Sequence, residues 1–323
     1  DQIHTSILPS IPFHMHRKIN GVVLLDKPLG LSSNQAVQKA KRIFSAMKCG
    51  HTGTLDPLAT GLLPLCFGEA TKFSSVLLTA NKTYETTLKL GYRSTTGDAE
   101  GEIHSLLTQA ARPTLSHCEQ VLARFIGRIQ QIPPMYSALK HQGKPLYSYA
   151  RKGAEIDRPA RAVHIHEIRV NALHADELTL SIRCGTGTYI RTLAEDIGKA
   201  LGCGGAYLLQ LRRTAIDYFD VSQAQTLAML NETTIDQLDR SVLPIDCLLQ
   251  KYPAITLDEI NALHIVQGRI IQHQTVAMAA PEHATVRLYT HHRHLLGLGE
   301  ITPDRRIVAK RLLANSELLG KAV

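Results

Sequence analysis

The chain has 323 residues, 44% of them hydrophobic, and its 36 lysines and arginines against 28 aspartates and glutamates give a formal net charge of +8. This length suits one large domain and a small one, and the basic surplus favours an anionic partner. No apolar run approaches the roughly 20 residues of a membrane span, and the first twenty residues lack the apolar core of a signal peptide, so we expect a cytoplasmic protein without a membrane partner.

Metal and cofactor signatures are weak. The six cysteines form no Cys-x-x-Cys pair, which argues against a zinc ribbon or a redox motif. Histidines cluster at 164–166 and 291–294, but the sequence places no acidic or cysteine ligand to complete either site, so solvated histidines are favoured. No Walker pattern or complete dinucleotide-binding glycine pattern is present. We therefore expect no metal and no cofactor.

The first predicted elements are a strand and a helix. Residues 1–19 carry no clean periodicity and are interpreted as a lead-in segment. Residues 21–26 form an apolar run that predicts a buried strand, which ends at the Lys-Pro pair at 27–28. Ser32 or Ser33 can cap the following helix. Its apolar residues recur at helical spacing at Ala36, Val37, Ala40, Ile43, Phe44 and Met47.

A shaped loop follows this helix, and its one carboxylate between positions 50 and 61 is Asp56. Pro57 disfavours the α region for Asp56, which favours an extended or turn conformation there. Residues 62–67 are an apolar run typical of a buried strand, which would hold the loop against a core. An Asp-Pro pair alone most simply marks a turn, so the residues leave both a turn and a functional carboxylate open.

A strand and a helix are expected after this loop. Beyond a short helix near 69–78, residues 82–90 alternate as a half-buried strand does, and Tyr84 opens that strand. On the pattern alone Tyr84 is an ordinary strand aromatic. A polar loop over 91–102 and a helix over 115–125 come next.

The segment 130–161 is basic and rich in tyrosine. Between positions 140 and 161 it has six basic and two acidic residues, which concentrates a net charge of +4. Flat aromatic rings beside phosphate-seeking charges are expected where a protein grips folded RNA, although a mobile basic surface loop fits the composition too. The RNA-binding candidates are Lys140, Lys144, Arg151 and Lys152.

A second strand-to-helix junction lies at 185–192. The apolar spacing after it predicts a helix from Tyr189 to Leu201, with Tyr189 and Arg191 in its first turn. Arg191 could bind a carboxylate on the same helix, such as Glu195 one turn later. The chain then changes character, because residues 253–313 are short apolar runs broken by glycine and proline, which predicts a small β-rich domain after a linker at 242–251. A basic cluster in it comprises Arg305, Arg306, Lys310 and Arg311.

Two adjacent motifs form a long, ungapped pattern. They are His51-x-Gly53-x-Leu55-Asp56-Pro57-x-Ala59-x-Gly61 and Gly68-Glu69-Ala70-Thr71-Lys72. The pattern resembles the catalytic motif of the TruB family of tRNA pseudouridine synthases, and the similarity extends from about Gly21 to Arg213. The resemblance implies an α+β fold with a mixed, mainly antiparallel sheet and flanking helices over 20–245. It also implies a PUA-like RNA-binding domain over 252–323.

The same resemblance implies a role for each candidate site residue. Asp56 would be the catalytic nucleophile or base, and Arg191 would pair with it and keep it ionised. Tyr84 would stack on the target uracil, Leu211 would line its pocket, and His51 would prop the place that the flipped base vacates or anchor the loop. The further substrate-binding candidates are Tyr189 and Lys72.

The implied partner is tRNA, held at its T-arm by a thumb-like insertion at 130–161 and at its acceptor stem by the C-terminal domain, with the enzyme acting as a monomer and without a cofactor. The expected reaction converts the T-loop uridine, conventionally position 55, to pseudouridine. Two alternatives are a guide-RNA-dependent pseudouridine synthase and a non-catalytic tRNA-binding or RNA-folding factor. The basic insertion argues against the first, and the intact set of Asp56, Tyr84 and Arg191 argues against the second.

Overall fold

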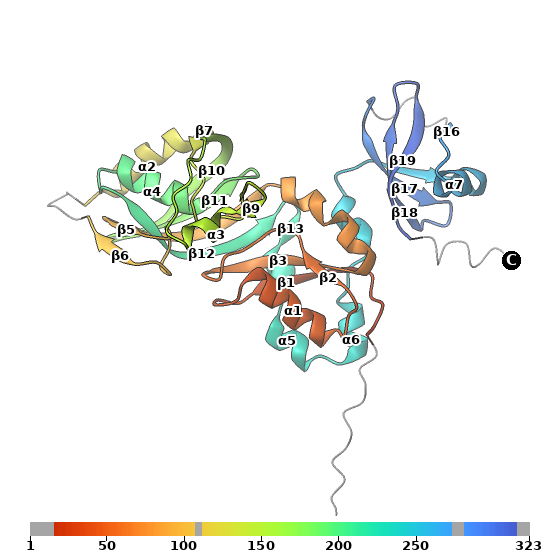
Figure 1. Cartoon of the computed structure of the whole chain (residues 1–323), viewed down its shortest axis with the longest axis horizontal. Helices are drawn as coiled ribbons and strands as arrows, with labels where there is room; N and C mark the ends of the chain where they lie inside the picture. The colour runs from red at the N-terminus through yellow and green to blue at the C-terminus, as the bar shows by residue number, and fades with distance from the viewer. Residues whose placement is uncertain (1–15, 107–111, 273–280, 315–323) are drawn as a thin grey trace, which may run out of the picture.

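The computed structural model describes residues 16–106, 112–272 and 281–314, so most of the predicted lead-in lies outside the described residues. Two separate sheets account for most of the strands, one large and one small (Figure 1). Across the described ranges, no helix has the length and the apolar character needed to cross a membrane.

The large sheet has ten strands. They are β1 (Gly21–Lys27), β2 (Cys49–His51), β3 (Ala59–Phe67), β4 (Lys82–Leu90), β7 (Gly127–Gln131), β10 (Arg161–His174), β11 (Glu177–Cys184), β12 (Ala206–Ile216), β13 (Phe219–Asp220) and β14 (Gln225–Thr226). Eight run in the order β14-β1-β3-β12-β4-β11-β10-β7, with β2 beside β3 and β13 beside β12. The β1–β14 and β3–β12 pairs are parallel, and the other pairs are antiparallel. The predicted mixed, mainly antiparallel sheet is confirmed.

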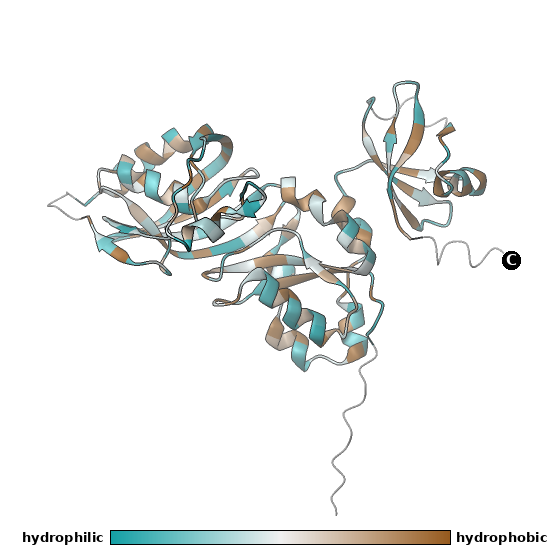
Figure 2. Cartoon of the chain, in the orientation of Figure 1, coloured by the Kyte–Doolittle hydropathy of each residue, from teal (hydrophilic) through white to brown (hydrophobic). Residues whose placement is uncertain are grey.

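Helices bury the two faces of this sheet in different places. One face packs against α1 (Ser33–Ile43), α2 (Leu115–Leu122), α4 (Ile190–Ala200), α5 (Leu227–Glu232) and α6 (Ile235–Arg240). The other packs against the 3₁₀ helices η1 (Gly68–Thr79), η3 (Val221–Gln223) and η4 (Ile245–Leu249). β1 is buried on both faces, with Val23 and Leu25 on the first and Val22 and Leu24 on the second, which explains its unbroken apolar run. Figure 2 shows hydrophobic and hydrophilic residues mixed along the strands and α1 as largely hydrophilic.

Smaller elements lie at the edges of the large sheet. The segment predicted as a polar loop, 91–102, contains β5 (Tyr92–Ser94), which pairs with β6 (Ile103–Ser105) just beyond it, so that prediction was wrong over β5. The single turn η2 (Ala123–Phe125) follows α2. The basic insertion contains the hairpin of β8 (Lys140–His141) and β9 (Lys144–Pro145), followed by α3 (Leu146–Ala150).

The small sheet has five strands in the order β15-β17-β18-β19-β16 and its own core. The strands are β15 (Ala254–Leu257), β16 (Ile271–Gln272), β17 (Thr285–Thr290), β18 (Leu295–Ile301) and β19 (Arg306–Leu312), and α7 (Glu259–Val266) packs beside them. Leu298 from β18 joins the core on the η1 and η4 side of the large sheet. The β-rich C-terminal domain is confirmed, but residues 247–249 of the predicted linker are buried in η4.

Local sequence signals explain most boundaries. Ser32, not Ser33, caps α1, because its side chain accepts from the Gln35 amide and the Gln35 side chain accepts from the Ser32 amide. The strand predicted at 62–67 begins earlier, at Ala59. The segment 68–79 winds as a 3₁₀ helix. These boundaries place the loop that carries Asp56 over the middle of the large sheet, directly before β3.

Candidate active site

The loop that carries Asp56 is fixed to the N-terminal part of α1. The Leu55 amide donates to Ser33 Oγ at 2.7 Å, and this hydroxyl lies 3.0 Å from the Leu55 carbonyl oxygen, to which it donates. The Gly30 amide donates to the Pro57 carbonyl at 2.8 Å. These bonds hold the residues on both sides of Asp56, so its carboxylate projects from a rigid support.

Arg191, in the first turn of α4, forms an ion pair with Asp56, with Nη2 at 3.0 Å from Oδ2. Two further bonds go to backbone, since Nη1 donates to the Thr96 carbonyl at 3.0 Å and Nη2 to the Tyr136 carbonyl at 2.7 Å. Only 9% of the Arg191 side chain is exposed. The expected contact with Glu195 on the same helix is replaced, because Glu195 pairs with Lys199. The ion pair predicted from the family resemblance is therefore present.

The loop between β5 and β6 closes around this arginine. Buried Asp98 places Oδ2 at 4.0 Å from Nε of Arg191, and it accepts hydrogen bonds from the Thr96 hydroxyl and the Glu100 amide. Gly97 has φ +80°, and a Cβ there would lie 3.2 Å from Cβ of Arg191. A side chain at Gly97 would therefore strain the turn and crowd the arginine.

The charges around Asp56 act in opposite directions. Burial raises the pKa of the Asp56 carboxyl, the Arg191 guanidinium lowers it, Asp98 raises it and Lys27 lowers it, with a net rise. The Asp56 side chain is 42% exposed, so water reaches one edge of the carboxyl and limits the effect of burial. Fully buried Lys27 donates to the Pro28 and Leu31 carbonyls, and burial lowers the pKa of its ammonium to about 8. The two cations thus favour the carboxylate form that a nucleophile or a base requires.

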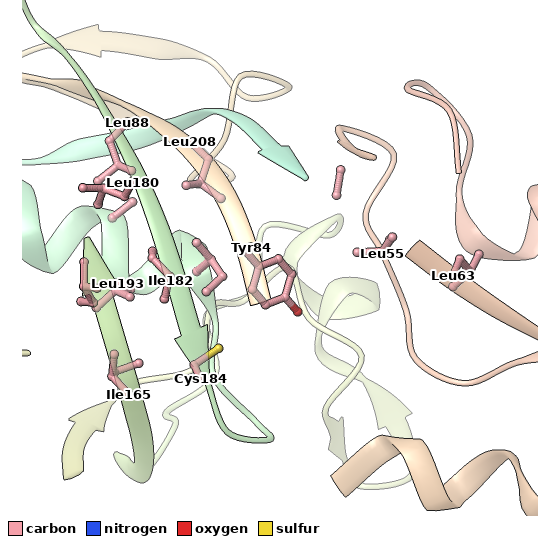
Figure 3. Packing of buried hydrophobic residues seen from close by; sticks show 14 of the residues in the cluster. Leu55, Leu63, Tyr84, Leu88, Ile165, Leu180, Ile182, Cys184, Leu193 and Leu208 are labelled. Atoms are coloured by element: carbon pink, nitrogen blue, oxygen red, sulfur yellow. The ribbon is translucent and has the colours of Figure 1, made fainter. Parts of the chain in front are cut away.

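Tyr84 lies on β4 next to this pair. It is buried, with Leu55 on one side and Ile182 and Cys184 on the other (Figure 3). Its partner across the β4–β12 pair is Arg213. Burial raises the pKa of the Tyr84 hydroxyl while Arg213 lowers it, with a net rise, so the ring presents a neutral aromatic side chain.

Arg213 ties the Asp56 loop to the sheet. It is 2% exposed, and Nε donates to the Leu62 carbonyl at 2.8 Å while Nη2 donates to the Gly53 carbonyl at 3.2 Å. Gly61 permits this approach, because a Cβ at Gly61 would lie 2.2 Å from the Arg213 carbonyl oxygen. A buried arginine therefore connects β12, β3 and the loop that carries Asp56.

The other predicted residues of the site lie around this centre. His51, at the end of β2, accepts the Gly53 amide at Nδ1 over 3.3 Å, and burial lowers the pKa of its ring. Half-buried Leu211 on β12 lies opposite Ala59 of β3. Tyr189 precedes α4, and both its amide and its carbonyl bond the Gln131 side chain, at 3.1 and 3.3 Å.

Lys72 is positioned away from this group. Its ammonium pairs with Glu69 at 2.6 Å and donates to the Leu312 carbonyl of β19 at 3.2 Å, while Arg311 donates to the Lys72 carbonyl at 3.3 Å. The structure therefore does not bring Lys72 into the Asp56 site. Its bonds join η1 to the small sheet.

The basic insertion presents its charges to solvent. Lys140, Lys144, Arg151 and Lys152 are exposed, and none forms an ion pair with another described residue. Arg151 lies over the Tyr147 ring, with its guanidinium carbon 5.4 Å from the ring centroid. The insertion is linked to the site, because the Tyr136 carbonyl accepts from Arg191.

The charges of the C-terminal basic cluster are less free to bind a partner than those of the basic insertion. Arg306 pairs with Asp304, and Lys310 pairs with Glu300 at 3.0 Å. Arg311 donates to the Lys72 carbonyl. Three of the four residues of this cluster therefore already have partners within the fold.

Three supporting residues escaped the sequence reasoning. In the sequence, Lys27 marked only the end of a strand, Asp98 lay unremarked within the polar loop at 91–102, and Arg213 marked only the end of the family resemblance. A lysine ending an apolar strand and an arginine at an inward strand position were the available signals, since buried charges need partners. Asp98 carried no signal, because polar loops commonly contain aspartate.

Family models match three consecutive parts of the chain. They are described as "TruB family pseudouridylate synthase (N terminal domain)" over residues 41–190, "tRNA pseudouridylate synthase B C-terminal domain" over 191–250 and "Pseudouridine synthase II TruB, C-terminal" over 253–313. The chain is 55% identical over 302 residues to tRNA pseudouridine synthase B of Nitrosospira multiformis, covering 92% of this chain and 96% of that protein. It is 48% identical to the protein of that name from Nitrosomonas europaea, covering 93% and 98%.

Solved structures share the fold at lower identity. A Cbf5-Nop10-Gar1 complex matches with a TM-score of 0.70 at 24% identity, covering 94% of this chain and 87% of that one. An H/ACA RNP bound to a substrate RNA containing 2′-deoxyuridine matches with a TM-score of 0.71 at 22% identity, covering 95% and 89%. These likenesses extend over both sheets.

Proposed function

Because the chain belongs to the TruB family of tRNA pseudouridine synthases, which are isomerases, we propose that it converts the T-loop uridine of tRNA, conventionally position 55, to pseudouridine with Asp56 as the catalytic carboxylate. The ion pair between Asp56 and Arg191 at 3.0 Å carries this proposal. It provides an oriented, negatively charged group beside the aromatic ring of Tyr84.

The reaction breaks the bond between uracil N1 and ribose C1′, turns the base and joins C1′ to C5. The C5 proton leaves to solvent, and N1 takes up a proton. Asp56 serves either by attacking C1′ or by removing a ribose proton, and both routes need an ionised carboxylate. Arg191 and Lys27 favour that form. No net oxidation or reduction occurs, because product and substrate are isomers.

The target base must leave its stack to reach Asp56, which costs a few kcal/mol. Stacking on Tyr84 contributes roughly 1–3 kcal/mol and offsets much of this cost. Leu211 lines the uracil pocket from β12. His51 fills the vacated place, since its Nδ1 is held by the Gly53 amide and its ring is kept neutral by burial.

The insertion at 130–161 grips the T-arm through phosphate contacts, and the small sheet, a PUA-like module over 252–323, contacts the acceptor stem. The first contact is supported by exposed charges that form no ion pair within the described part of the chain, namely Lys140, Lys144, Arg151 and Lys152. The catalytic domain spans 20–245, and its Asp56, Tyr84 and Arg191 come from one chain. A monomer is therefore sufficient for the chemistry.

The test is tritium release from C5-labelled, unmodified tRNA transcript with no second RNA present. Asp56→Asn is nearly isosteric, so it should abolish release while tRNA binding and the circular dichroism spectrum stay as in the wild type. Asp236→Asn, at an exposed position of α6, is the matched control and should keep full activity. Turnover by Asp56→Asn near the wild-type rate would remove Asp56 from its role, and a requirement for a guide RNA would favour the guided alternative.

A further inference from the structure

Three side chains with metal-binding chemistry meet at one edge of the small sheet, far from the residues around Asp56. Glu259 opens α7, and His291 and His292 follow β17. Their candidate ligand atoms all lie within 4.8 Å of one another, and His291 Nε2 is 3.7 Å from Glu259 Oε1. The sequence showed the histidines but no acidic ligand beside them. The fold supplies that ligand from a distant position.

The sheet register explains this meeting. β15 and β17 are parallel neighbours, with Leu257 opposite Thr290. The chain leaves both strands at the same end, so the residues that directly follow them reach the same edge. Glu259 lies two residues beyond Leu257, and the two histidines lie one and two residues beyond Thr290. Figure 1 shows α7 beside β17 at this edge.

Both supporting backbones are held by hydrogen bonds. In the turn between β17 and β18, the Thr290 amide donates to the His294 carbonyl at 2.9 Å, and the His294 amide donates to Thr290 Oγ1 at 3.1 Å. The start of α7 is capped by Asp258, which accepts the Asn261 amide at 2.8 Å. The two elements therefore present their ligands from fixed positions.

We propose that Glu259, His291 and His292 form a binding site for a divalent transition metal, with zinc as the best fit. Zinc takes imidazole nitrogen and carboxylate oxygen at about 2.0–2.2 Å, so neighbouring ligand atoms around it are roughly 3.4 Å apart. The 3.7 Å between His291 and Glu259 is near this value, and the exposed His292 reaches the ion by side-chain rotation. This assignment replaces the expectation of no metal.

The site is open to solvent, and its role is to join two elements of the small domain. Its three ligands are exposed, and water or His294, whose ring centroid is 6.4 Å from that of His292, completes the coordination. The bound ion links the start of α7 to the β17–β18 turn. It therefore stabilises the small sheet and takes no part in the chemistry at Asp56.

Isothermal titration calorimetry of zinc into untagged, full-length protein tests the site. We expect one site, and His291→Ala or Glu259→Gln should each weaken binding by about tenfold or more. His283→Ala is the matched control, because His283 also lies near a glutamate, Glu300, at 3.4 Å but has no second histidine in its described surroundings. It should bind zinc as the wild type does.

Cobalt substitution and thermal unfolding give two independent readouts. Cobalt should give visible absorption bands with the wild type and His283→Ala but not with His291→Ala, and zinc should raise the melting temperature of the first two proteins only. Circular dichroism checks that the variants are folded. Zinc binding that is absent from the wild type, or unchanged in both His291→Ala and Glu259→Gln, would overturn the proposal.

Discussion

Replacing Arg191 by methionine tests how the protein keeps Asp56 reactive. The guanidinium lies 3.0 Å from the carboxylate and lowers the pKa of Asp56 against the effect of burial. Its removal should raise that pKa further. The carboxylate fraction then falls at a given pH, so the loss of rate should be greatest in acid and should shrink as the pH rises.

The expected size follows from the exposure of the pair. A hydrogen bond to a charged group contributes about 1.5–3 kcal/mol. Since the Asp56 side chain is 42% exposed, solvent screening favours the low end, which corresponds to about a tenfold change in rate. The ratio of wild-type to variant rate should therefore be about tenfold larger on the acid limb than on the plateau. A second, pH-independent loss should come from the freed Thr96 and Tyr136 carbonyls.

The assay is the pH dependence of single-turnover tritium release from labelled tRNA. Arg191→Lys is the matched variant, because it keeps the positive charge but loses the planar fork. It should lower the plateau rate and leave the acid limb near its wild-type position. If the acid limb of Arg191→Met coincides with that of the wild type, the electrostatic part of this reasoning is refuted.

Two further predictions concern RNA binding and stability. Neutralising Lys144, Arg151 and Lys152 together should reduce the slope of log affinity against log salt by about 2–3, because each phosphate contact releases counterions. The control Arg169→Gln on β10 should change this slope little. An unaltered slope for the triple variant would place the RNA elsewhere. Arg213→Met leaves one buried and one part-buried carbonyl without their donor and should destabilise the fold by roughly 2–5 kcal/mol in urea unfolding. Wild-type stability would contradict the proposed link between β12 and the loop that carries Asp56.

The sequence predicted the secondary structure best where the apolar residues followed a single helical or strand periodicity. The amphipathic helices α1 and α4 were expected from their apolar spacing, and the half-buried β4 was expected from its alternation. The hairpin of β5 and β6 was missed because its strands are three residues long and lie within polar sequence. Such strands depend on tertiary contacts more than on local pattern.

The residues of the candidate site also differ in how well the sequence predicted their positions. Asp56 and Arg191 are far apart in the chain, and only the family resemblance predicted that they meet. Pattern alone offered only Glu195 as a possible partner for Arg191, because helical spacing reports neighbours on the same helix and nothing beyond it. Lys72 belongs to the same motif as Asp56, but η1 carries it to the small sheet, where Glu69 and β19 bind it. Sequence proximity to the proposed catalytic residue did not specify position in space.

The position of β12 in the sheet affects how the chain can fold while it is being synthesised. β12 lies between β3 and β4, yet both are translated long before it. Until the ribosome has made residue 216, the nascent chain has two unpaired strand edges at what becomes the middle of the sheet. Such edges invite pairing with other chains, so the emerging polypeptide should be most prone to aggregate, and most dependent on chaperones, in this interval.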